Sequence, residues 1–138
     1  MKAKNLVFTL ATLVLGVVLM SFVSVPQQKK GEAWKIPAEY KAKKNPVKGD
    51  ASLERLGKAA WAKHCRSCHG NLGKGDGPKA ASMKTFPGDF SDAAFQAHTD
   101  GDIYYMSFVG RGEMPNFESK ITDEEERWAV VNLIRTMK

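Results

Sequence analysis

The feature that most constrains this 138-residue chain is one short motif, Cys65-Arg-Ser-Cys68-His69, which holds both of its cysteines. The spacing C-x-x-C-H is the pattern to which a c-type haem is attached. Each thiol can bond one vinyl group of a haem, and the following histidine then lies under the iron as an imidazole ligand. The motif therefore predicts one covalently attached haem c, with Cys65 and Cys68 bound to the porphyrin and His69 bound to the iron.

Three other uses of the two cysteines remain as alternatives. A disulfide between them would leave the adjacent histidine without a role. A redox pair of the thioredoxin type belongs in a strand-to-helix turn, and the sequence around the motif shows no alternating strand pattern. A zinc site needs four ligands, and only His64 and His98 remain to complete the set. Haem attachment explains more of the motif than any of these.

Apolar residues at helical spacing predict an all-α fold around the motif. A first helix is predicted over residues 52–64, with Asp50 and Ser52 as possible caps, and it runs directly into the motif. A last helix is predicted near the C-terminus, where Thr122 and Glu125 have the spacing of a capping box. The apolar share of 43% and the charged share of 26% agree with a folded, mostly water-soluble domain.

Shorter helical segments are predicted between these two helices. One covers residues 103–109, begins after Asp100 or Thr99 and stops at Gly110, and another forms a single turn over 91–96. Glycines predict a loop after the motif, at positions 70, 73, 75 and 77. The expected fold is a small all-α domain of about 3–5 helices.

The N-terminal part contains an uncharged apolar run over residues 6–25, preceded by Lys2 and Lys4. A run of about 20 apolar residues can span a bilayer, and the preceding lysines are typical of a secretory signal. The run ends in a poor cleavage site, which favours an anchor over a cleaved signal. We expect residues 1–25 to be a signal peptide or an uncleaved membrane anchor helix, with the remainder exported.

Residues 26–50 are expected to form a Pro/Lys-rich tether before the folded domain of residues 51–138. Its sizeable apolar side chains, which we expect either to stay free or to lie on the domain surface, are Trp34, Ile36 and Tyr40. The formal net charge of +6 comes without a recognisable nucleic-acid-reading module, so nucleic-acid binding is not expected. The basic bias suits an acidic protein partner or lipid headgroups.

Residues 57–69, Gly-Lys-Ala-Ala-Trp-Ala-Lys-His-Cys-Arg-Ser-Cys-His, resemble the haem-binding start of class I cytochromes c. The family pattern is Gly-x-x-x-aromatic-x-x-x-Cys-x-x-Cys-His. The resemblance covers about residues 52–138 and implies a small cytochrome c fold around one haem. It implies that Gly57 lets the first helix cross closely against the last, with Trp61 packed at the crossing. The aromatic residue often found late in the last helix is Leu133 here, while Trp128 lies earlier.

The same resemblance implies the second iron ligand. Residues 110–117, Gly-Arg-Gly-Glu-Met-Pro-Asn-Phe, resemble the family's Met-Pro loop, so Met114 is the expected sixth ligand of the iron. A neutral thioether favours ferrous iron and raises the reduction potential relative to two imidazoles. Gly77-Pro78 resembles the turn whose proline carbonyl accepts a hydrogen bond from the axial histidine. The alternative is that Pro78 only forms a turn. Arg111 is expected either to neutralise a haem propionate or to remain a solvated loop residue.

Both axial positions would then be filled, which leaves one-electron transfer as the expected function and no enzymatic role for the chain itself. We expect an exported carrier or respiratory-chain subunit on the periplasmic side of a bacterial cytoplasmic membrane, or free in the periplasm if the signal is cleaved. Expected partners are a quinol-oxidising complex, a terminal oxidase or another reductase. The alternatives are a haem enzyme or gas sensor with a labile sixth ligand, and a structural haem subunit.

Overall fold

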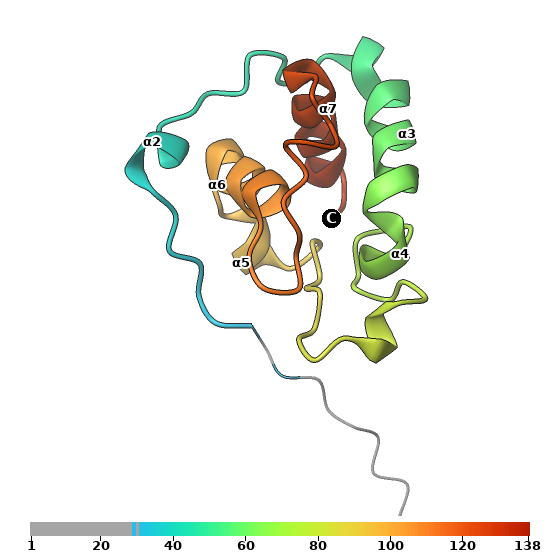
Figure 1. Cartoon of the computed structure of the whole chain (residues 1–138). Coiled ribbons are helices and arrows are strands. Elements are labelled where there is room, and N and C mark those ends of the chain that lie inside the picture. The colour runs from blue at the N-terminus through green and yellow to red at the C-terminus, as the bar shows by residue number, and fades with distance from the viewer. Residues whose placement is uncertain (1–28, 30) are drawn as a thin grey trace, which may run out of the picture.

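The computed structural model describes residue 29 and residues 31–138 (Figure 1). The expected signal or anchor of residues 1–25 lies outside the described residues. Within the part of the chain that is described, no helix is long and apolar enough to cross a membrane.

The described residues form an all-α fold, as the sequence predicts. They contain six α-helices, of which α2, α4 and α5 are four residues long, so the expected number of helices is slightly exceeded. The α-helices are α2 (Ala38–Lys41), α3 (Glu54–His64), α4 (Arg66–His69), α5 (Ala93–Gln96), α6 (Asp100–Tyr104) and α7 (Glu124–Arg135). Shorter turns are the 3-10 segments η2 (Ala51–Leu53) and η3 (Ala80–Ser82) and the π-helical segment η4 (Tyr105–Val109).

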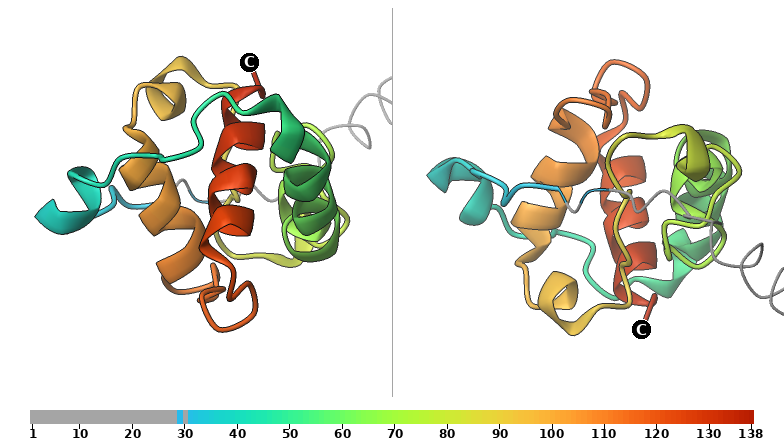
Figure 2. Two further views of the ribbon diagram at one scale, coloured as in Figure 1. Left: turned by 90° about the horizontal axis from the view of Figure 1, so that it is seen from above. Right: turned by 90° about the horizontal axis from the view of Figure 1, so that it is seen from below.

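Helices α3 and α7 lie side by side and form the main helix pair of the domain (Figures 1 and 2). A Cβ atom placed on Gly57 would lie 2.4 Å from the carbonyl oxygen of Ala129, so only glycine allows this approach. Trp61 is 4% exposed and packs in the core one turn later. The close crossing that the sequence predicts at Gly57 is therefore present.

The caps before α3 and α7 lie close to the positions that the sequence predicts. The Asp50 carboxylate accepts a hydrogen bond from the Ser52 amide at 2.9 Å before α3. The predicted capping box of Thr122 and Glu125 is wrong, because Asp123 is the N-cap of α7 and accepts from the Glu125 amide at 2.9 Å. Starting the helix one residue later moves Glu125 out of the position from which it would reach back to the cap.

The central helical segment starts at Thr99, which forms a capping box with Asp102. Its last turn, η4, has π geometry, and the Gly110 amide donates to the carbonyl of Tyr105 at 3.3 Å. Gly110 ends the segment with φ +69°, as expected of a helix-terminating glycine. The helix expected over residues 103–109 thus begins earlier, at Asp100, and stops where predicted.

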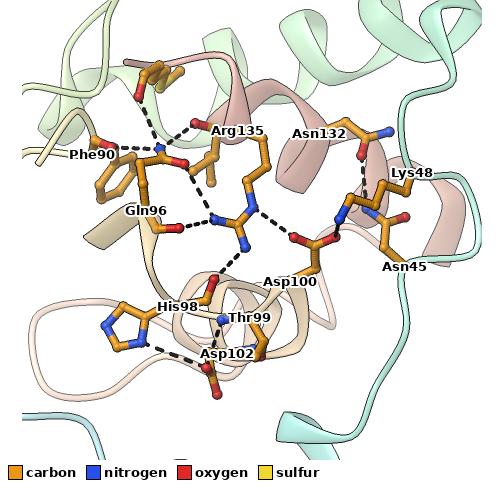
Figure 3. A network of polar contacts seen from close by, with 12 residues as sticks. Asn45, Lys48, Phe90, Gln96, His98, Thr99, Asp100, Asp102, Asn132 and Arg135 are labelled. Atoms are coloured by element: carbon orange, nitrogen blue, oxygen red, sulfur yellow. Dashed lines mark hydrogen bonds and ion pairs between the residues drawn. The ribbon is translucent and has the colours of Figure 1, made fainter. Parts of the chain in front are cut away.

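A partly buried polar network joins the C-terminal helix to its neighbours (Figure 3). Arg135 on α7 donates to the Asp100 carboxylate at 2.7 Å and to the Gln96 carbonyl at 2.8 Å. The Gln96 amide in turn donates to the carbonyl of Phe90 at 2.7 Å. These bonds tie α5, α6 and α7 together on one side of the core.

The segment before α3 packs on the domain over much of its length. It runs from α2 across α6 and α7 to reach α3 (Figure 2). Three of its side chains contact the core: Trp34, Ile36 and Tyr40. Of the two arrangements that we expected for them, they adopt the one packed on the domain. The Asn45 amide donates to the side chain of Asn132 on α7 at 2.8 Å. From residue 31 onward, the expected tether is therefore fastened to the domain.

Candidate functional site

The haem-attachment motif begins at Cys65, the C-cap of α3, and continues through α4. Cys65 ends α3, and its carbonyl accepts from the amides of Cys68 at 3.2 Å and His69 at 3.0 Å. Both thiols are free. The helical backbone thus fixes the two thiols and the imidazole relative to one another, and the disulfide alternative is not what the structure contains.

His69 is buried beside aromatic rings and has the protonation state of a metal ligand. Its side chain is 7% exposed, and its ring centroid lies 4.7 Å from that of Phe90 and 5.9 Å from that of Trp61. Burial lowers the pKa of His69 to about 4. The imidazole is therefore neutral at physiological pH and has a lone pair for iron.

The second ring nitrogen of His69, Nδ1, is buried and has no hydrogen-bond partner among the described residues. The Gly77-Pro78 turn does lie against the motif, because the Gly77 amide donates to the Cys68 carbonyl at 3.1 Å. The bond that we expected from Nδ1 to the Pro78 carbonyl is not formed here and stays a prediction. An unpaired buried nitrogen is the atom for which such an acceptor is expected once iron fixes the ring.

The surroundings of the cysteines do not suit zinc or dithiol redox chemistry. Burial raises the pKa of the Cys65 thiol to about 12, with a smaller contribution from Cys68, whereas reactive cysteines have a lowered pKa. His64 packs edge-on against the ring of Phe117 at 5.7 Å, and His98 lies 3.7 Å from the Asp102 carboxylate. Among the described residues, no group of three or more His, Cys, Asp or Glu side chains is placed to hold a metal ion.

Met114 lies in a tightly held loop between η4 and α7. The Met114 amide donates to the Arg111 carbonyl at 2.9 Å, and the Phe117 amide donates to the Phe108 carbonyl at 2.8 Å. A Cβ on Gly110 would lie 2.4 Å from the Met114 carbonyl oxygen, so the loop closes tightly at its start. Met114 is half-buried against the core, and Phe117 contacts His64 of α3. The loop thus packs against the helix that leads into the motif.

Arg111 is engaged by the N-terminal segment. Its Nη1 donates to the carbonyl of Ala33 at 2.9 Å, its Nη2 donates to the carbonyl of Glu32, and its guanidinium lies over the Trp34 ring at 4.0 Å. Sequence reasoning missed this use of Trp34. The only signal was a large aromatic residue isolated in a polar segment, and nothing local pairs that residue with Arg111.

The residues present fit a covalently attached haem, because two free thiols and a neutral buried imidazole occur at the required spacing. A comparison with protein families matches residues 52–134 to the family described as cytochrome C oxidase, cbb3-type, subunit III. No curated protein matches the chain significantly. Because the family match covers more than half of the chain and includes the whole motif, the chain belongs to this family of c-type cytochrome domains and carries covalently bound haem c.

Proposed function

We propose that the chain is a one-electron carrier in which His69 and Met114 occupy both axial positions of the haem iron. The family implies haem-based electron transfer, and the ligand pair is the finer statement that we add. The observation that carries it is the fixed Met114 loop, which is closed by hydrogen bonds at Arg111 and at Phe108. Because the loop is held at both ends, it would keep the Met114 thioether in one position.

The side chains around the motif suit a site for electron exchange. When bound, the haem supplies an iron that passes between the ferrous and ferric states. His69 and Met114 are neutral ligands, so neither has to gain or lose a proton when the iron changes charge. Trp61 and Phe90 enclose the imidazole and exclude water, which limits the solvent rearrangement that accompanies each transfer.

The proposed ligand pair would leave the chain without an enzymatic role of its own. With both axial positions occupied by protein, the iron has no free position for a substrate. The chain would then act as an electron-transfer subunit of an oxidoreductase complex or as a carrier beside one. The family description names an oxidase, which supports a terminal oxidase as a partner, and a quinol-oxidising complex or another reductase would complete the route.

We further propose that the domain is held at the periplasmic face of a bacterial cytoplasmic membrane by residues 1–25. Since the Lys29 carbonyl accepts from the Phe86 amide at 3.1 Å, only residues 26–28 separate such an anchor from a residue that is bonded to the domain. Three extended residues reach at most about 11 Å. The domain would stay close to the membrane, at a high effective concentration for membrane-bound partners.

Membrane fractionation tests the anchor. The full holoprotein is expected to sediment with membranes and to need detergent for release. Recovery of a holoprotein that begins near Pro26 in the soluble fraction would contradict the anchor and leave the electron-transfer proposal intact.

Substitution of Met114 tests the ligand pair. Met114→Ala in the ferric holoprotein is expected to lose the weak far-red band that arises from sulfur bound to iron. Met83→Ala is the matched control, because Met83 is a half-buried methionine outside the loop, and it should retain the band. An unchanged band in Met114→Ala would refute the assignment.

A further inference from the structure

The N-terminal strap, which we define as residues 31–34, is joined to the loop that carries Met114. The joining residue is Arg111, whose guanidinium donates to the carbonyls of Glu32 and Ala33 and lies 4.0 Å from the centre of the Trp34 ring. A planar guanidinium makes both kinds of contact at once, which an ammonium group does not reproduce. The strap and the loop therefore share one side chain as their link.

The backbone of Arg111 belongs to the turn that positions Met114. Its carbonyl accepts from the Met114 amide at 2.9 Å, and the two residues pair as an isolated antiparallel bridge. The neighbouring Gly110 and Gly112 both have positive φ, so the turn has a conformation that few other residues adopt. A displacement of the Arg111 backbone would therefore move the Met114 backbone with it.

A second contact fixes the loop at Glu113, two residues after Arg111. The Glu113 carboxylate accepts from the amides of Lys84 at 3.1 Å and Thr85 at 2.9 Å. The same segment pairs with the N-terminal part of the chain, since the Phe86 amide donates to the Lys29 carbonyl at 3.1 Å. Both residues that flank Gly112 are thus held by segments distant in the sequence.

The strap itself is fixed to the domain. Trp34 packs edge-on against Tyr105 with ring centroids 6.3 Å apart, and Tyr40 contacts the same ring at 4.8 Å. A Cβ on Gly101 would lie 1.9 Å from the Tyr40 carbonyl oxygen, so the chain after the strap lies directly on α6. The strap is therefore a fixed support against which the loop is held.

We propose that the strap keeps Met114 on the haem iron, with Trp34 and Arg111 as positioning residues. The inference rests on the proposed ligation by His69 and Met114. A shift of the Met114 backbone that withdraws the thioether from the iron also moves the paired Arg111 backbone and breaks the contacts of Arg111 with the strap. Retention of the sixth ligand then depends on residues that precede the matched family region, which begins at residue 52.

The test compares carbon monoxide uptake by the dithionite-reduced holoprotein with the far-red band of the ferric form. Trp34→Ala removes the stacked ring, and Arg111→Gln removes the guanidinium. Neither substitution changes a side chain that is proposed to bind the iron. In each variant, the population with an open sixth position is expected to rise about tenfold, which raises the rate of carbon monoxide binding by the same factor. The far-red band should weaken by no more than the fraction of molecules that opens.

Two further variants separate positioning from general stability. Trp34→Phe keeps a ring under the guanidinium and is expected to restore most of the wild-type behaviour. Asn45→Ala removes the 2.8 Å bond to Asn132 in the same N-terminal segment, away from the Met114 loop, and should leave carbon monoxide uptake unchanged. Equal increases in Asn45→Ala and Trp34→Ala would show a general loosening and overturn the proposal.

The remaining outcomes distinguish this inference from the proposed function. If the wild-type protein shows the far-red band but the variants remain inert to carbon monoxide, only the proposal about the strap is overturned. A wild-type protein without the band would overturn both proposals. A shift of midpoint potential in Arg111→Gln without any change in Trp34→Ala would assign Arg111 to a haem propionate and overturn the strap. If Trp34→Ala fails to fold, Arg111→Gln decides, because that side chain is exposed.

Discussion

His69 and Met114, the two proposed ligands of the iron, are held by different kinds of contact. The histidine side is local, because the backbone bonds that position His69 come from Cys65 within the same helical turn. The methionine side is assembled from distant parts of the chain, and the bond from Arg111 to Ala33 alone joins residues 78 positions apart. A histidine that directly follows a cysteine attached to the haem needs little further support. A loop that carries a dissociable thioether depends on the segments that hold it in place.

The largest loss of stability is expected at the crossing of α3 and α7, which supports the helix that leads into His69. Gly57→Val would place its side chain against the Ala129 carbonyl, where a Cβ already lies 2.4 Å away, and should lower the free energy of unfolding by about 3 kcal/mol. Urea unfolding of the holoprotein measures this.

Ala59→Val is the matched control on an exposed position of the same helix, and it should cost about 0.5 kcal/mol, the helix propensity difference. Equal losses in the two variants would mean that the close crossing does not support the motif.

A smaller effect is expected on the α6 side of the domain, which carries the methionine loop. Burial raises the pKa of Tyr104 to about 12, and the ring lies 4.5 Å from that of Trp128. The folded state thus holds the phenolic proton more tightly than the unfolded chain. This contribution is complete below pH 10 and is lost as the pH rises towards 12.

Its loss should remove about 2.7 kcal/mol of stability at most, and Tyr104→Phe should abolish that part of the pH dependence. Chemical unfolding of both proteins at a series of alkaline pH values measures it. Identical pH profiles would show that Tyr104 does not contribute.

The smallest effect is expected at Glu113, which lies on the surface. Hydrogen bonds from the amides of Lys84 and Thr85 lower the pKa of its carboxyl below 4.5. The hydrogen bonds to the Glu113 carboxylate are therefore intact above that pH, and they weaken as the pH falls through the lowered pKa. Glu113→Gln should raise carbon monoxide uptake by the reduced protein about twofold at neutral pH, less than the strap variants.

Acid titration of carbon monoxide uptake by the reduced protein provides the second measurement, because uptake by the wild type should rise at low pH and Glu113→Gln should not show that step. A variant that behaves like the wild type at every pH would remove Glu113 from the account of the methionine side.

The same difference between local and distant contacts explains which features the sequence predicts. The motif is predicted from its own short spacing. The Gly57 crossing and the place of the Met114 loop are implied by the resemblance of two short segments to class I cytochromes c. The cap of α7 is not, because Thr122 and Asp123 are both competent caps and the backbone conformation selects between them. The pairing of Trp34 with Arg111 has no local pattern at all, since it depends on how two separated segments pack.

The central claim is that protein side chains occupy both axial positions of the iron. Addition of carbon monoxide to the dithionite-reduced, purified wild-type holoprotein tests this most directly. The account predicts no change in the Soret region of the difference spectrum, because Met114 fills the sixth position. A strong Soret shift would contradict it and would favour a haem whose sixth position is open for sensing or catalysis.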